Sequence, residues 1–277
     1  MVTPHTNRQD AREREDELGP AYRLEVMRYA AGEPSVEEVE VPTEVPLTIV
    51  ANGVEVATLL ATPTDLRPLV LGFLFSAGMV RSAAELLACR IDPVRWVADC
   101  ELTRTPDPEL LDRRVYTSGC GKGVMFANVV ELAGRKPLEG GLTLSPAQVV
   151  ELASALNRAS GLYRRTRGVH TAALGVGGSV PERWFDDVGR HNAVDKAIGH
   201  ALAKGLDLAR CALVCSGRTS SEILHKARRA GIPVCISRGS PTHQSVLRAR
   251  DMGVTLICHA KGGGFTVYAH PERVVER

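Results

Sequence analysis

The sequence has few aromatic residues, little net charge and no long apolar run. Aromatic side chains make up only 4% of the 277 residues, which disfavours a stacking surface for single-stranded nucleic acid. A formal net charge of +2 provides no broad electrostatic footprint for DNA. No stretch approaches the roughly 18 apolar residues of a membrane-spanning helix. We therefore expect a protein that neither binds DNA nor inserts into a membrane.

The cysteines lack the pattern of a disulfide framework or of a zinc site. There are seven, an odd number, and most stand in apolar stretches that are typical of buried strands. No Cys-x-x-Cys pair occurs, so paired zinc ligands are missing and Cys120 has no neighbouring thiol for a dithiol redox pair. Free thiols, no bound metal and a reducing cytoplasm are the expected state.

The composition divides the chain into four segments. Residues 1–20 are charged throughout, without an apolar signal-peptide core, and are expected to form a disordered tail. Residues 21–104 predict a small β-rich domain, with a hairpin turn at Asn52-Gly53. Residues 105–144 are so rich in glycine and proline that we interpret them as an interdomain connection. In residues 145–277 strand and helix patterns alternate, which predicts an α/β layer structure.

Capping signals and apolar periodicity predict where the helices begin. Polar residues that can cap a helix precede each apolar run, and Ser145 with Gln148, like Thr219 with Glu222, has the spacing of a capping box. The predicted helices start at Thr64-Asp65, Ser82, Ser145, Asn192, Thr219 and Ser240.

Cys120 stands in the polar stretch Val-Tyr-Thr-Ser-Gly-Cys-Gly-Lys-Gly-Val, residues 115–124. So many glycines leave little packing around the sulfur, and Lys122 lies close in sequence. A nearby cation lowers a thiol pKa, and the thiolate is the reactive form. A reactive cysteine and an exposed bystander are equally compatible with this pattern.

Two tandem turns share one design. Each runs from a strand through serine, arginine and glycine into a helix, and backbone N–H groups at a helix start suit a phosphate. Ordinary capped turns have the same appearance, so both interpretations stay open. The candidate phosphate-binding residues are Ser216, Arg218, Thr219, Arg238 and Ser240.

Asp187, Arg190 and His191 belong to the densest polar cluster in the chain, and His170 precedes a predicted strand. Such residues can perform acid–base chemistry or hold a polar ligand. A salt-bridged helix start and a structural histidine are the alternatives.

A glycine-rich loop is predicted between two strands near the end of the chain. Its three successive glycines allow a ligand to approach the backbone closely, and Lys261 adds a positive charge. A flexible hairpin loop is the alternative. The loop comprises His259, Ala260, Lys261, Gly262, Gly263 and Gly264.

Several of these stretches occur together, and in this order they resemble the FdhD family. They are SGCGKG, RGVHTAAL, DDVGRHNAVDK, CSGRTSSEI and HAKGGGFTVYAHPERV, and the resemblance as a whole extends from about residue 22 to residue 275. The resemblance implies a cytoplasmic homodimer with a second domain similar to the three-layer cytidine deaminase fold. It also implies a sulfurtransferase that takes persulfide sulfur from a cysteine desulfurase. The sulfur passes to the molybdenum cofactor, or its tungsten counterpart, in the bis-guanine dinucleotide form, for formate dehydrogenase.

The resemblance assigns the persulfide to Cys120 and cofactor binding to residues 259–264. Many family members have a second loop cysteine where this chain has Gly123, so sulfur cannot pass between two loop cysteines here. Two other functions are kept as alternatives: a cofactor-binding chaperone without sulfur chemistry, and a nucleotide hydrolase that uses the cluster from Asp186 to His191.

Overall fold

The computed structural model describes residues 18–30, 32–106, 114–116, 124–126 and 136–276. Within these residues the strands form four sheets, of six, four, two and two strands. The mixture of helices and sheets confirms the α/β class. Among the described helices, none combines the length and the apolarity of a membrane span.

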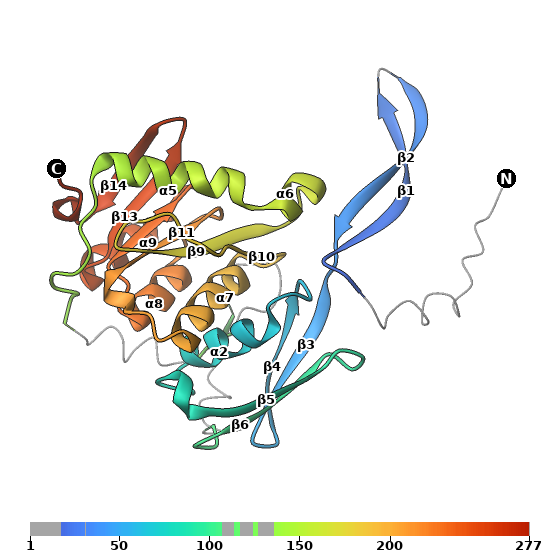
Figure 1. Ribbon diagram of the computed structural model, residues 1–277, viewed down its shortest axis with the longest axis horizontal. Coiled ribbons are helices and arrows are strands. Elements are labelled where there is room, and N and C mark those ends of the chain that lie inside the picture. Colours follow the sequence, from blue (N-terminus) through green and yellow to red (C-terminus); the bar gives the residue numbers. More distant parts are fainter. Residues whose placement is uncertain (1–17, 31, 107–113, 117–123, 127–135, 277) are drawn as a thin grey trace.

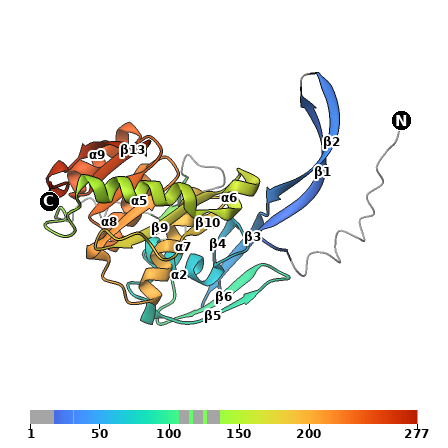
Figure 2. The same ribbon diagram turned by 45° about the horizontal axis from the view of Figure 1, so that its top comes forward.

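The first strands form a ribbon that projects from the remainder of the molecule. Strands β1 (Ala21–Ala30) and β2 (Glu33–Pro42) pair antiparallel along their whole length. The ribbon extends away from the other sheets in both views (Figures 1 and 2). Tyr29 at its far end is 73% exposed, so the distal half of the ribbon contributes little to the core.

The four-stranded sheet has the order β4-β3-β6-β5. Its strands are β3 (Val45–Ala51), β4 (Val54–Ala61), β5 (Leu86–Asp92) and β6 (Val97–Leu102). The predicted hairpin turn is confirmed, because Asn52 and Gly53 join β3 to β4 with φ of 50° and 80°. Two successive positive φ values are the backbone that a two-residue type I′ turn requires.

In this half the helix predicted after Thr64-Asp65 is confirmed but its side-chain cap is not, and the helix predicted from Ser82 is wrong. Helix α2 (Leu66–Ser76) begins after Asp65, but that side chain makes no capping hydrogen bond and instead pairs with Arg183. Asp65 has φ of 52°, which is incompatible with the extended backbone of a usual N-cap. After Ser82 there is only the short 3₁₀ turn Ala83–Glu85, and β5 follows at once.

The six-stranded sheet has the order β10-β9-β11-β12-β13-β14 and lies between two layers of helices. Strands β11, β12 and β13 are parallel, whereas β9, β10 and β14 are antiparallel to their neighbours. The strands are β9 (His170–Val176), β10 (Phe185–Asp187), β11 (Cys211–Cys215), β12 (Val234–Ser237), β13 (Thr255–Lys261) and β14 (Gly264–Ala269).

One face of this sheet is covered by α5 (Pro146–Ala159), which α6 (Gly161–Thr166) continues. The other face is covered by α7 (Arg190–Ala203), α8 (Ser221–Ala230) and α9 (His243–Met252) (Figure 1). Successive residues of β11 point to opposite faces of the sheet: Val214 packs on the α5 side and Leu213 on the other side. Both faces of the sheet are therefore apolar and each binds a layer of helices. The C-terminal half is therefore a three-layer α/β structure, while its likeness to the deaminase fold stays a prediction.

The capping box at Ser145 is confirmed, α7 begins at Arg190 rather than at Asn192, and the starts predicted at Thr219 and Ser240 are displaced. Ser220, not Thr219, is the N-cap of α8, and α9 begins after Thr242, which forms a capping box with Ser245. The reason is tertiary: the Thr219 N–H donates to the Ser240 carbonyl over 3.1 Å. This contact between successive turns delays both helices.

One hydrophobic core extends from the four-stranded sheet through α2 and α7 to the six-stranded sheet. The two helices approach closely where Gly72 faces Asp195 and Gly199 faces Pro68. A Cβ on Gly72 would lie 1.9 Å from the Asp195 carbonyl oxygen, so a side chain there would separate the helices. The division into domains at residue 105 stays a prediction, and both halves contribute side chains to this core.

Candidate functional site

Most of the predicted site residues lie at one edge of the six-stranded sheet. The two serine–arginine turns follow β11 and β12, where the carboxyl ends of parallel strands meet. Strand β9 runs antiparallel to β11, so its first residue, His170, reaches the same edge. The Ser216 hydroxyl lies 3.4 Å from His170 Nδ1 and also accepts the Thr171 N–H over 3.0 Å. Ligands of α/β sheets bind at such edges.

The two turns are bonded to each other. The Arg238 N–H donates to the Cys215 carbonyl and the His259 N–H donates to the Gly239 carbonyl, each over 3.1 Å. Gly239 packs on the backbone of the first turn, since a Cβ there would lie 2.9 Å from the Arg218 nitrogen. The structure therefore brings both turns and His259 together.

Arg190 and Arg218 supply positive charge at this edge without an ion-pair partner among the described residues. Arg190 is the first residue of α7 and packs over Gly217, where an added Cβ would lie 3.0 Å from the Arg190 Cβ. Its Nε is buried and has no hydrogen-bond partner. An unpartnered buried donor is costly unless a ligand satisfies it.

Burial, followed by the charges of Arg190 and Arg218, lowers the pKa of His170, with Asp187 opposing. His170 is therefore neutral at neutral pH, and the arginines supply the positive charge. Arg238 differs, because its guanidinium donates to the Asn157 side chain of α5 over 3.1 Å.

Asp187 is the register partner of His170, but its side chain is buried in an ion pair with Lys196. Their charged atoms are 2.7 Å apart and both side chains are fully buried. Asp187 also accepts hydrogen bonds from the backbone of Thr62 and Gly189 and from the Asn192 side chain. These contacts fasten α7 to the end of β4, so Asp187 has a structural role in addition to any other.

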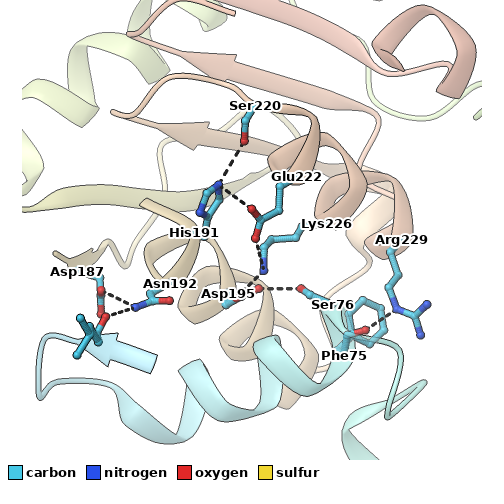
Figure 3. Close-up of polar contacts among 11 residues, drawn as sticks. Phe75, Ser76, Asp187, His191, Asn192, Asp195, Ser220, Glu222, Lys226 and Arg229 are labelled. Atoms are coloured by element: carbon cyan, nitrogen blue, oxygen red, sulfur yellow. Dashed lines mark hydrogen bonds and ion pairs between the residues drawn. The ribbon is translucent and has the colours of Figure 1, made fainter. Parts of the chain in front are cut away.

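His191 belongs to a second buried network that connects α8, α7 and α2 (Figure 3). Its Nε2 lies 3.2 Å from the Ser220 hydroxyl and 3.3 Å from Glu222. Burial, with the charges of Lys226 and Arg190, lowers the pKa of His191 to about 2. The ring is neutral, so its contact with Glu222 is not an ion pair.

Lys226 continues this network with a 2.7 Å ion pair to Asp195, which also accepts the Ser76 hydroxyl over 2.7 Å. Asp187 and His191, which are near neighbours in sequence, thus belong to two different buried networks. The sequence pattern gave no indication of this burial.

The predicted glycine loop is mostly strand. His259, Ala260 and Lys261 are the last residues of β13, and Gly264 begins β14. Only Gly262 and Gly263 turn, with φ of 61° and 81°. A Cβ on either would meet nothing within 4 Å, so the glycines serve backbone conformation rather than packing. The segment is therefore a hairpin with a two-residue turn, and four of the six residues predicted as loop belong to strands.

Cys120 lies outside the described residues, as do Lys122 and Gly123. The strands on either side are described: β7 (Arg114–Tyr116) pairs antiparallel with β8 (Val124–Phe126), with Tyr116 opposite Val124.

The comparisons with known proteins agree with one another. The FdhD/NarQ family matches residues 42–275. A sulfur carrier protein FdhD from Bacillus subtilis is 37% identical over 260 residues, which are 91% of this chain and 97% of that relative. A protein of the same name from Staphylococcus aureus is 37% identical over 257 residues, with 91% and 95% coverage.

A solved structure supports the same conclusion. The crystal structure assigned to a formate dehydrogenase accessory protein from Desulfotalea psychrophila superposes with a TM-score of 0.76 and 25% sequence identity. The match covers 92% of this chain and 99% of that one. Since the family match spans most of the chain and curated relatives exceed one third identity over nine tenths of it, the chain belongs to the FdhD/NarQ family.

Proposed function

We propose that this protein is a sulfur carrier that serves formate dehydrogenase maturation from the cytoplasm. Its relatives carry the name sulfur carrier protein, and the residues that resemble the family include the Gly-Cys-Gly context of Cys120. A cysteine desulfurase is the proposed donor. The proposed acceptor is the molybdenum cofactor in the bis-guanine dinucleotide form, which is a substrate rather than a resident group. The family resemblance also supports a homodimer.

The first chemical step requires only one thiol of this chain. The Cys120 thiolate attacks the terminal sulfur of a persulfide on the desulfurase, and the desulfurase cysteine leaves as a thiolate. Cys120 then carries the persulfide. Because Gly123 offers no second thiol, the acceptor has to collect this sulfur from Cys120 itself.

The unpaired arginines at the sheet edge are the observation that carries the cofactor-binding part of the proposal. Arg190 and Arg218 flank a neutral His170, and the buried Arg190 Nε has no partner. A guanine dinucleotide carries phosphates, and guanidinium groups bind phosphates through charge-assisted hydrogen bonds. The backbones of Gly217 and Gly239 pack closely against Arg190 and Arg218.

Calorimetry with GDP tests this arrangement. We expect Arg190→Ala and Arg218→Ala each to weaken GDP binding by about 10-fold or more, because each removes charge-assisted hydrogen bonds to phosphate. Arg95→Ala is the matched control, since it removes an exposed arginine from the turn between β5 and β6. If Arg190→Ala and Arg218→Ala both bind GDP with wild-type affinity, the two turns are ordinary helix caps and not a phosphate site.

The structure argues against the nucleotide hydrolase. Asp187 is fully buried against Lys196, and burial with nearby cations lowers the pKa of His191 to about 2. Neither group is placed to accept a proton from water at a ligand. The chaperone without sulfur chemistry differs from the proposal only at Cys120.

A further inference from the structure

Two cysteines of the four-stranded sheet face each other directly. Cys89 of β5 and Cys100 of β6 are register partners in an antiparallel ladder, and both are free thiols. Their side chains point to the same face, since partners across a ladder share a face. Cys100 is fully buried and Cys89 is 8% exposed.

This arrangement satisfies the geometric requirement of a disulfide. Directly opposed residues of an antiparallel pair have Cα atoms about 4.5–5.5 Å apart. Disulfides form when the Cα atoms are about 4.4–6.8 Å apart and the Cβ vectors converge. The two sulfurs can therefore join with little backbone movement.

The two thiols already interact. The neighbouring Cys100 thiol, whose Sγ donates to the Ala98 carbonyl over 3.7 Å, is the main cause that lowers the pKa of Cys89, and the charge of Arg67 assists while burial opposes. The Cys89 thiol and burial raise the pKa of Cys100. Cys89 is thus the better nucleophile, and it lies on β5, the edge strand of the sheet.

The other described cysteines have no such partner. In the six-stranded sheet, the residues paired with Cys211, Cys215, Cys235 and Cys258 are not cysteines. Burial raises the pKa of the Cys215 thiol to about 11 and that of Cys258 to about 12. The facing pair is specific to β5 and β6 within the described residues.

We propose that Cys89 and Cys100 form a reversible intrachain disulfide by exchange with a low-molecular-weight disulfide such as oxidised glutathione. The Cys89 thiolate attacks one sulfur of the oxidant, whose S–S bond breaks to release one glutathione thiolate. Cys100 passes its proton to that thiolate and attacks the Cys89 sulfur, releasing the second glutathione. The protein pair loses two electrons, and the oxidant becomes two reduced glutathiones.

The disulfide ties the edge strand to its neighbour. Edge strands open first in local unfolding because they have partners on one side only. The chain continues from β6 into residues 103–113 and then to β7, the strand that precedes Cys120. Oxidation therefore makes more rigid the sheet that precedes the Cys120 segment in sequence, without using Cys120.

Peptide mapping tests the proposal on the full-length chain. Reduced protein is treated with oxidised glutathione, its remaining thiols are alkylated in denaturant, and trypsin is added without reductant. Cleavage after arginine places the two cysteines in separate peptides, Ser82–Arg90 and Trp96–Arg104. We expect these peptides joined in one species that dithiothreitol separates, and the same species from Cys120→Ser.

Thermal unfolding gives a second measurement. Oxidation should raise Tm by roughly 5 °C in the wild type and in Cys235→Ala, but not in Cys89→Ala. Both peptides recovered in alkylated form, glutathione retained on Cys89, or either cysteine joined to a third one would overturn the proposal. The peptide map of the wild type decides this even where a variant fails to fold.

Discussion

Replacing Cys120 by serine is expected to abolish formate dehydrogenase maturation while the protein stays folded. A serine hydroxyl cannot hold a persulfide, so the carrier step is lost rather than slowed. The glycines around Cys120 provide little packing for the sulfur to maintain, so its removal should not reduce stability. Complementation of a strain that lacks this protein measures maturation, and circular dichroism with a thermal melt measures folding.

Cys235→Ala is the matched control for that experiment. Cys235 is 2% exposed in the core of the six-stranded sheet, and its removal leaves a cavity. We expect a loss of about 1 kcal/mol or more in the free energy of unfolding, with maturation retained by the folded protein. Full complementation by Cys120→Ser would contradict the carrier function.

Replacing Lys196 by methionine is expected to lower the free energy of unfolding by about 3–5 kcal/mol. Lys196 and Asp187 are both fully buried, so the substitution leaves a carboxylate without its cation in the interior. Lys196 also donates to the Thr62 and Asp186 carbonyls, which lose a donor together with the charge. Urea denaturation followed by circular dichroism measures the change.

Two further variants test whether the unpaired buried charge causes the loss of stability in Lys196→Met. Lys204→Met removes an exposed lysine at the C-terminal end of the same helix and should change stability by less than about 0.5 kcal/mol. Adding Asp187→Asn to Lys196→Met should recover part of the loss, because no buried charge then remains. If Lys196→Met alone kept wild-type stability, the pair would not be the anchor of α7.

Local signals predicted much of the fold. Asn52-Gly53 specified its hairpin because few residues adopt two successive positive φ values, and Ser145 capped its helix as its spacing indicated. Gly231 and Gly253 end α8 and α9 with φ of 74° and 70°, a left-handed backbone for which glycine is the usual residue. These features depend on neighbours in sequence, so the sequence alone was sufficient.

Contacts between distant segments could not be predicted in this way. Thr219 has the spacing of a capping residue, but its bond to Ser240 in the next turn displaces the helix start. The contact between Arg190 and Gly217 depends on where α7 and β11 meet, and the pairing of Cys89 with Cys100 depends on strand register. None of these distances appears in the sequence.

The polar cluster illustrates the same limit at the candidate site. Asp187, Arg190 and His191 are near neighbours in sequence, but only Arg190 presents an unpaired group to the sheet edge. A helix start directs successive side chains in different directions, so two of the three enter buried networks. Which residue faces a ligand is decided by packing against α2 and α8.

Mass spectrometry of the protein after incubation with a cysteine desulfurase and cysteine is the most direct test of the carrier function. Trypsin releases Cys120 in the peptide Val115–Lys122, where it is the only cysteine. The account predicts a gain of about 32 Da on this peptide, reversed by a reducing thiol. A peptide of unchanged mass, or added sulfur on another cysteine instead, would contradict it.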